Sequence, residues 1–258
     1  VLANLECAPT THAEPWTATP KAFHFRASPE ATAIRAAANI RWVSLANNHS
    51  MDFGATGLVD TLAHLDAAGI AHAGAGRSRA EAMAPSLVTL GAVRVGLIAL
   101  TDNEPPFAAG EARPGTWHTR IGTTEAVLAP IAERVGALRA AGAELVVLSV
   151  HWGPNMVEEP HVAHRAFARE VAALGVDLVH GHSAHLVQGI GLCDGPPIFS
   201  PARDTLDDYA VDPVLRNDHS VLFRLEGDAR GPARLTLLPL QLSFAQVDLA
   251  TGETAATI

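Results

Sequence analysis

The sequence predicts an α/β protein in which buried strands alternate with helices. Short apolar runs rich in β-branched residues are followed by segments with helical periodicity, as residues 41–46 are followed by residues 54–69. Glycines stand where several of these helical segments end, which is typical of helix C-termini. The 258 residues are enough to bury one large core, so we expect a single domain over residues 1–258.

Each expected element rests on a local pattern. Residues 29–39 should form a helix because Ser28 is a good cap and Pro29 suits the first helical position. Gly91-Ala92 fits the turn of a β-hairpin. The remaining expected elements, in chain order, are strands at 1–5 and 41–46, a helix at 55–68, a short strand at 71–76, a helical turn at 79–83, hairpin strands at 87–90 and 93–101, a helix at 123–141, a strand at 144–150, a helix at 160–174, a strand at 176–179 and antiparallel strands at 220–225, 234–240 and 241–247.

Composition and charge limit the partners of this protein. The formal net charge is -9, which argues against nucleic acid, because phosphate backbones are bound by clustered Lys and Arg. No apolar run reaches the roughly 18 residues of a membrane span. The two cysteines, Cys7 and Cys193, imply no disulfide framework and leave a single bridge open. These features favour a small-molecule partner and leave the oligomeric state undetermined.

The first residues have a pattern typical of the middle of a buried strand. They read Val1-Leu2-Ala3-Asn4, so we expect a segment upstream of Val1. No signal peptide is visible in the chain as given, which favours a cytoplasmic location. An anchor in an upstream segment would instead place the protein outside the cytoplasm.

One strand ends abruptly in two amides, an imidazole and a carboxylate. Asn47, Asn48 and His49 follow the strand expected at 41–46. They should lie at the carboxyl edge of a sheet, where open α/β proteins bind ligands. Taken alone, these residues fit two interpretations equally well: an Asn-rich turn with Asp52 as a cap, or part of a functional site.

Three other predicted strands also end in groups that bind metals. Glu6 follows the first strand, and His151 follows the strand at 144–150. His182 and His185 follow the next strand. A carboxylate, an Asn carbonyl and several imidazoles form a mixed N/O set that suits Mn, Fe or Zn, and no Cys cluster indicates a structural zinc site. We therefore expect one or two divalent ions, which would activate a water for hydrolysis.

Two histidine patterns elsewhere are ambiguous. His24 and Arg26 share one side of an alternating segment and could bind an anion, although the pattern itself favours a solvated edge strand. His161 and His164 share one helix face at a spacing that suits a metal. Their position near an exposed helix start favours a surface location.

Four motifs together carry a family resemblance: Asn4-Leu5-Glu6, Asn47-Asn48-His49, His151-Trp152-Gly153 and Gly181-His182-Ser183-Ala184-His185. In order and spacing they resemble the poly-γ-glutamate capsule biosynthesis family (CapA/PgsA), which is related to the calcineurin-like metallophosphatases. The resemblance covers nearly the whole chain. It implies a metallophosphatase-like βαββ sandwich of two mixed sheets flanked by helices.

The resemblance also implies a role for each site residue. The metal ligands would be Asn48, His151, His182 and His185, with Glu6 in place of the superfamily's bridging carboxylate. His49 would protonate the leaving group, and Asp52 would orient or charge-stabilise His49.

The chain departs from the family pattern in several places, and two of these departures concern the metal site. The Gly-Asp pair expected on an N-terminal strand is absent, so the number of metals depends on residues before Val1. Ser183 replaces the middle His of the common Gly-His-His-Pro-His pattern, which leaves open which imidazole serves which metal.

Four further residues are expected around the substrate, because Arg is a natural clamp for carboxylate or phosphate. They are His24, Arg26, Asp204 and Arg216. For each of them, an ion pair that supports the local loop is an equal alternative.

Two functions therefore fit the sequence. The first is a metal-dependent hydrolase acting on a phosphoester or on an amide of an acidic substrate, such as one related to poly-γ-glutamate. The second is a non-catalytic accessory protein of capsule synthesis or export that binds an acidic polymer or a synthase and uses the metal structurally.

Overall fold

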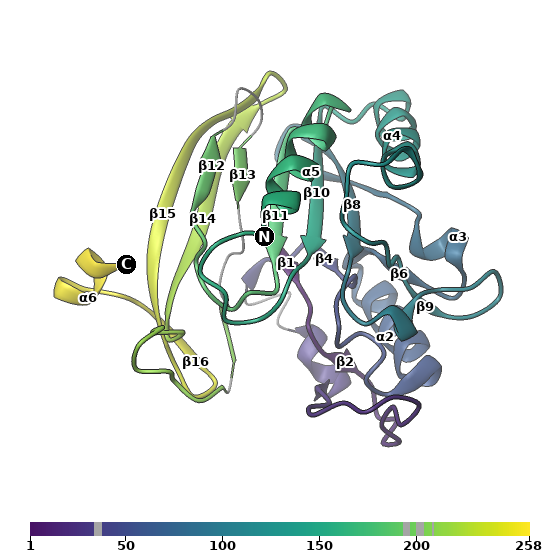
Figure 1. Cartoon of the computed structure of the whole chain (residues 1–258), viewed down its shortest axis with the longest axis horizontal. Helices are drawn as coiled ribbons and strands as arrows, with labels where there is room; N and C mark the ends of the chain where they lie inside the picture. Colours follow the sequence, from purple (N-terminus) through teal and green to yellow (C-terminus); the bar gives the residue numbers. More distant parts are fainter. Residues whose placement is uncertain (34–37, 193–196, 200–203, 208) are drawn as a thin grey trace.

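The computed structural model describes residues 1–33, 38–192, 197–199, 204–207 and 209–258. Three larger β-sheets form the body of the molecule, with helices on the outside (Figure 1). The sheets are built from different parts of the chain. The polar groups that the sequence places after strands lie at strand ends of a six-stranded sheet and of a three-stranded sheet, which are described next.

The largest sheet has six strands in the order β12-β13-β11-β10-β8-β7. These strands are β7 (Ser86–Leu90), β8 (Val93–Thr101), β10 (Leu145–His151), β11 (Leu178–His182), β12 (Ile190–Leu192) and β13 (Pro197–Phe199). The inner strands are parallel, and both edge strands run antiparallel to their neighbours. Alternation along the strands directs Ile98, Leu100 and Leu148 toward α4 (Glu125–Ala140) and α5 (Val162–Ala173).

A three-stranded parallel sheet packs on the opposite face of the six-stranded sheet. Its strands are β1 (Leu2–Asn4), β4 (Trp42–Ser44) and β5 (Ala71–Ala73). Trp42 is fully buried in one cluster with Leu97 and Val147 of the larger sheet. Helix α2 (Gly54–Ala68) covers the outer side with its buried leucines. The two sheets and their flanking helices form the layered sandwich that the sequence predicts.

Short elements connect these layers. They are β2 (Ala8–Pro9), β3 (Arg26–Ala27), the 3-10 helix η1 (Pro29–Ala33), β6 (Ala75–Gly76), α3 (Arg79–Ala82), the 3-10 helix η2 (Pro105–Phe107) and β9 (Gly115–Thr116). β2 pairs with β3, and β6 pairs with β9.

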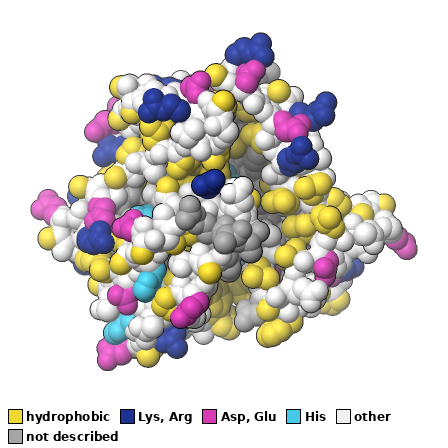
Figure 2. Space-filling model, turned by 180° about the vertical axis from the view of Figure 1, so that it is seen from behind, with side chains coloured by type: hydrophobic (Ala, Val, Ile, Leu, Met, Phe, Trp, Pro, Cys, Tyr) yellow, Lys and Arg dark blue, Asp and Glu magenta, His cyan; other side chains and the backbone are white. Residues whose placement is uncertain are grey.

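The C-terminal part of the chain forms a separate antiparallel sheet. Its strands are β14 (His219–Asp228), β15 (Gly231–Ser243) and β16 (Gln246–Leu249), and α6 (Gly252–Thr257) follows them. Phe223, Leu225 and Leu235 pack against the core between the other two sheets. Hydrophobic side chains are also exposed on this side of the molecule (Figure 2). Those of the sheet and its last turn are Leu222, Leu237, Phe244, Val247 and Leu249.

Most predicted elements are confirmed, and α2 ends at Gly69 in a left-handed conformation (φ 62°) as its glycine indicates. Three expectations need correction. The helix predicted from Pro29 begins as the 3-10 helix η1, where the Thr32 hydroxyl donates to the Pro29 carbonyl; residues 34–37 of that prediction lie outside the described residues. The edge strand expected in the segment up to Arg26 is reduced to β3, because the Phe25 backbone N–H donates to Asp52 Oδ2 and not to a neighbouring strand.

The third correction concerns the last strands. The segments predicted at 234–240 and 241–247 are largely one strand, β15, because Leu240 pairs with β14 on one side and with β16 on the other. The turn comes later, at Ala245, which has a left-handed backbone (φ 53°).

Cys7 is a free thiol, whereas Cys193 lies outside the described residues. No helix in the described part of the chain is long and apolar enough to cross a membrane.

Gly74 should be the glycine on which the contact between the sheets depends. It has φ +92°, and a Cβ there would lie 2.6 Å from the Ala46 Cβ and 2.8 Å from the Ala99 Cβ. We expect Gly74→Ala to lower the free energy of unfolding by about 2–5 kcal/mol, through backbone strain and overpacking. Gly91→Ala is the matched control, because Gly91 has φ +63° with open space around it among the described residues, and should cost only about 1–2 kcal/mol. Equal losses in urea unfolding would contradict this prediction.

Asp218 should make folding sensitive to acid. Arg216 donates two hydrogen bonds of 2.8 Å to its carboxylate, which hold the Asp218 pKa well below its usual range. A carboxyl with a lowered pKa stabilises the fold above its unfolded pKa of about 3.9 and loses that effect as the pH falls. Asp218→Asn should therefore destabilise at pH 7, and the difference from wild type in urea unfolding should shrink near pH 3. Asp248→Asn, on exposed β16, is the control and should change stability by less than about 0.5 kcal/mol at both pH values.

Candidate functional site

Polar side chains from the three-stranded and the six-stranded sheet meet at the carboxyl ends of their parallel strands. The residues that arrive there are Glu6 after β1, Asn48 and His49 after β4, His151 at the end of β10 and His182 at the end of β11. His151 and His182 are direct neighbours across the β10–β11 ladder. Because the carboxyl ends of parallel strands share one edge, the sandwich brings these residues together from distant parts of the chain.

Glu6 is the point on which this group converges. Its Oε1 lies 3.8 Å from His151 Nε2 and 4.0 Å from His49 Nε2. Within the described part of the chain, Glu6 Oε1, Asn48 Oδ1 and His151 Nε2 are all buried without a hydrogen-bond partner. Burial raises the pKa of Glu6 to about 7. Buried polar atoms are normally satisfied, so these three atoms are candidates to bind a ligand.

His49 forms a dyad with Asp52. The His49 Nδ1 lies 2.6 Å from Asp52 Oδ2, and the Asp52 side chain is fully buried. The turn that carries them is fixed by Asn47, whose Oδ1 accepts a hydrogen bond of 3.0 Å from the His49 backbone N–H. Burial lowers the pKa of His49, and the hydrogen bond and charge of Asp52 partly offset that shift. Asp52 thus holds Nδ1 of His49, a contact compatible with the orienting role that the family resemblance implies.

Two amides next to the site hold it together. Asn47 Nδ2 donates to Asn4 Oδ1 at 3.0 Å and to the Leu5 carbonyl at 2.9 Å. Asn4 Nδ2 in turn donates to Glu6 Oε2 at 2.8 Å. The second oxygen of the carboxylate, Glu6 Oε1, is thereby turned toward the imidazoles. Sequence reasoning did not assign these roles, although Asn4 lies within the Asn-Leu-Glu motif and Asn47 within the Asn-Asn-His motif.

His151 and His182 contact each other through their imidazoles. The two Nδ1 atoms are 2.8 Å apart, and His182 Nε2 lies 2.9 Å from Ser149 Oγ. Ser149 Oγ also lies 3.2 Å from His180 Nδ1. Burial lowers the pKa of His151 and His182 well below the usual value, and burial lowers that of His180 to about 4. The imidazoles of His151, His182 and His180 are therefore neutral near pH 7, the form in which histidine binds metals.

His185 belongs to a neighbouring acidic group. Its Nδ1 lies 2.6 Å from Asp204 Oδ2. Burial acts to lower the His185 pKa, but the hydrogen bond and charge of Asp204 outweigh it, and the net shift is upward. Burial and the charge of Asp204 raise the pKa of Asp207 to about 6. Asp204, expected near the substrate, thus reaches the site as the partner of His185.

Three other predicted substrate residues make their described contacts elsewhere. His24 Nε2 bonds the Trp16 carbonyl at 2.9 Å, and Arg26 Nη1 donates to the His12 carbonyl at 3.0 Å. Arg216 pairs with Asp218. The contact of Arg216 is an ion pair, as in the alternative left open for it, whereas those of His24 and Arg26 are hydrogen bonds to backbone carbonyls. Their role in substrate binding stays a prediction.

The predicted surface pair His161 and His164 lies at the start of α5. His161 Nδ1 accepts a hydrogen bond from the Ala163 backbone N–H and so caps the helix. His164 stacks on Trp152 with ring centroids 4.9 Å apart, and its Nε2 is 3.9 Å from Asp102 Oδ2. Both side chains therefore support the structure beside the end of β10.

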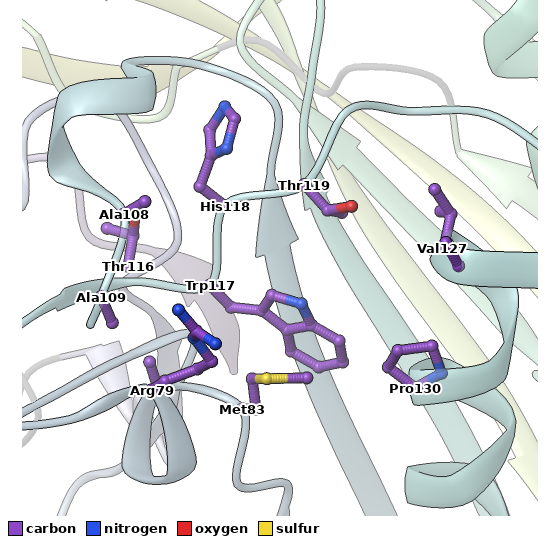
Figure 3. Close-up of a pocket in the computed structure, with 12 residues that line it drawn as sticks. Arg79, Met83, Ala108, Ala109, Thr116, Trp117, His118, Thr119, Val127 and Pro130 are labelled. Atoms are coloured by element: carbon purple, nitrogen blue, oxygen red, sulfur yellow. The ribbon is translucent and has the colours of Figure 1, made fainter. Parts of the chain in front are cut away.

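A separate cavity lies between α3, β9 and α4. It measures about 200 Å³, and its lining includes Arg79, Met83, Trp117, His118 and Pro130 (Figure 3). The described residues that line it include none of the predicted site residues. His118 links the cavity to the site, since His118 Nε2 bonds the Asp102 carbonyl and the Asp102 N–H bonds the His151 carbonyl, both at 3.2 Å.

Comparison with solved structures defines the class of fold. The chain is similar to the 5′-nucleotidase precursor of Thermus thermophilus, with a TM-score of 0.54 at 15% identity, over 82% of this chain and 41% of that one. A hypothetical protein from the same organism gives a TM-score of 0.50 at 11% identity, over 80% of this chain and 78% of that one. The fold is accordingly metallophosphatase-like α/β, as predicted.

The family follows from the sequence comparison. Residues 1–201 match the family of the bacterial capsule synthesis protein PGA_cap, and the chain belongs to this family. It is 35% identical over 246 residues to the probable polyglutamine synthesis accessory protein of Mycobacterium tuberculosis H37Rv, covering 93% of this chain and 64% of that protein. It is 25% identical over 247 residues to the PGA biosynthesis protein CapA of Bacillus subtilis strain 168, covering 95% of this chain and 62% of that protein.

These matches confirm the resemblance to the CapA family. The chain spans 64% and 62% of the lengths of the two relatives. The family match contains Glu6, Asn48, His49, His151, His182 and His185. Asp204 and Arg216 lie beyond it.

Proposed function

We propose that this protein is a metal-dependent hydrolase that uses Glu6, Asn48 and His151 as a metal-binding group. The observation that carries the proposal is the convergence of their buried oxygen and nitrogen atoms, unpartnered among the described residues, beside the His49–Asp52 dyad. An isolated buried carboxylate is unfavourable, whereas one facing a divalent cation is compensated. The position of the group at strand ends agrees with the ligand sites of α/β sheets.

The donor chemistry fits Mn, Fe or Zn, because it mixes carboxylate and amide oxygens with neutral imidazoles. Within the described ranges, no three His, Cys, Asp or Glu side chains are already arranged to hold a metal ion, and the proposed group also relies on the amide of Asn48. His182 would join by giving up its contact with Ser149 or with His151, and His185 could bind through Nε2 while its Nδ1 stays bonded to Asp204. When bound, a divalent ion supplies a Lewis acid that polarises the bond to be cleaved and favours deprotonation of a water.

His49 provides the proton in this proposal. In the imidazolium form, with Nδ1–H held by Asp52, its Nε2–H faces the group around Glu6 and can donate to a leaving oxygen or nitrogen. Asp52 stabilises the imidazolium that carries that proton. The buried surroundings keep water away from the dyad, which strengthens both interactions.

The substrate class is a phosphoester or an amide of an acidic molecule. The fold supports the first, since one of the similar solved structures is a 5′-nucleotidase precursor. The names of the relatives support the second, since they refer to polyglutamine synthesis and PGA biosynthesis. An acidic polymer would then be the partner of the whole protein.

The M. tuberculosis relative also supports a second candidate function, because its name describes an accessory protein. In that case the chain would assist synthesis or export of an acidic polymer without cleaving it. The metal would serve only to compensate the buried carboxylate.

His151→Ala and His182→Ala should each abolish metal uptake and turnover, because each removes an imidazole from the strand ends. Metal content after loading with Mn and dialysis, measured by mass spectrometry, tests the first effect. His64→Ala, on α2, is the matched control and should keep both properties. Full metal content in both strand-end variants would rule out the proposed centre.

Turnover separates the two candidate functions. Purified protein should be assayed with an aryl phosphate and with γ-glutamyl amides, each with and without added Mn. Hydrolysis that requires metal and is lost in His151→Ala supports the hydrolase. Metal binding without hydrolysis of either substrate class would favour the accessory protein.

A further inference from the structure

A short segment of the N-terminal loop closes over the His49–Asp52 dyad. Lys21 is its most unusual member, because a lysine side chain is rarely buried without a partner and this one is only 6% exposed. Lys21 Nζ donates to the Asn48 carbonyl at 2.7 Å and lies 3.4 Å from Asp52 Oδ1. Glu104 Oε1 is 3.8 Å away on the other side. The ammonium group thus contacts the backbone of one site residue and the carboxylate of another.

Phe25 reaches the same dyad from the same segment. Its backbone N–H donates to Asp52 Oδ2 at 2.6 Å, the oxygen that also contacts His49 Nδ1. Its ring stacks on the His49 imidazole with centroids 4.0 Å apart and planes 20° apart. The Tyr209 ring lies edge-on to the Phe25 ring, with centroids 5.8 Å apart. Phe25 therefore contacts both members of the dyad, one through its backbone and one through its ring.

From these contacts we propose that Lys21 and Phe25 are positioning residues that hold His49 in the tautomer protonated at Nδ1. An ionised Asp52 can only accept hydrogen bonds. Since Phe25 N–H donates to Oδ2, the neutral His49 must present Nδ1–H to the same carboxylate, which leaves Nε2 unprotonated toward Glu6. The Lys21 ammonium, 3.4 Å from Asp52 Oδ1, pairs with this fully buried carboxylate and favours its role as an acceptor.

The stacked ring adds a second restraint. An imidazole bonded at one nitrogen can still swing about that bond. The Phe25 ring lies nearly parallel to the imidazole and so restricts this motion. Nε2 then stays directed at the group around Glu6, which lies 4.0 Å away. The tautomer follows from these contacts alone; the consequence for turnover rests on the proposed function.

Nuclear magnetic resonance of the imidazole nitrogens tests the proposal without any substrate. Protein labelled with ¹⁵N-histidine is measured at about pH 8, where an ordinary imidazole is neutral. The His49 signals are assigned by their loss in His49→Gln. Wild type should show a protonated Nδ1 and an unprotonated Nε2. Lys21→Met should shift the population toward Nε2–H, and Phe25→Leu should give averaged shifts for the two nitrogens.

Two variants separate positioning from a general effect on folding. Phe25→Tyr keeps the aromatic ring and should keep the wild-type nitrogen shifts. Phe23→Leu removes an exposed ring of the same segment, 63% exposed, and should also leave them unchanged. If the hydrolase activity is present, Lys21→Met and Phe25→Leu should lower kcat about 10–100-fold while KM stays nearly constant.

The proposal is overturned if wild-type His49 carries its proton on Nε2, or if Lys21→Met and Phe25→Leu both fold and keep the wild-type shifts. A wild-type protein that shows the Nδ1–H tautomer but hydrolyses nothing would instead contradict the proposed function and leave the positioning role supported. The two hypotheses therefore fail on different measurements.

Discussion

A fully buried carboxylate, that of Asp52, determines how the parts of this molecule around the site must meet. A charge in an apolar interior is unfavourable by several kcal/mol unless it is paired and hydrogen-bonded. Here the compensation comes from the turn after β4, through His49, and from the N-terminal loop, through Lys21 and the Phe25 N–H. The loop cannot detach without leaving that charge unpaired. Its packing against the turn is therefore an electrostatic requirement as well as a hydrophobic one.

The same principle shapes the rest of the site. Glu6 is buried with one oxygen bonded by Asn4 and the other without a partner among the described residues. Burial keeps the nearest imidazoles neutral, so they cannot supply the missing positive charge, and the Nδ1 of His185 is used by Asp204. Parallel pairing fixes the strands beside which these residues lie, β1 with β4 before Glu6 and β10 with β8 at His151. This pairing limits how far the two side chains can turn toward other partners. These features are the reason for proposing a divalent cation as the partner of this centre.

Local patterns in the chain were enough to identify the residues that could do chemistry. Polar groups after buried strands are visible as abrupt changes in hydrophobicity, and Glu6, Asn48, His49 and His151 were all found in this way. The class of fold followed from the alternation of strands and helices. The pairing of Asp52 with His49 was expected from the family resemblance. Such signals depend on neighbours in the sequence, so they can be read without the folded structure.

Which of these residues meet, and what holds them, depends on long-range packing. Lys21 and Phe25 are separated from His49 in the chain by β3, η1 and β4, so no local pattern connects them to it. His24 and Arg26 lie in the same segment and were expected around the substrate, yet their side chains bond backbone carbonyls of the N-terminal loop. The sequence therefore supplied the donors and the class of fold, and the folded chain selected among them. A side chain of an irregular loop turns toward a buried charge only where the contact offsets its own loss of conformational entropy.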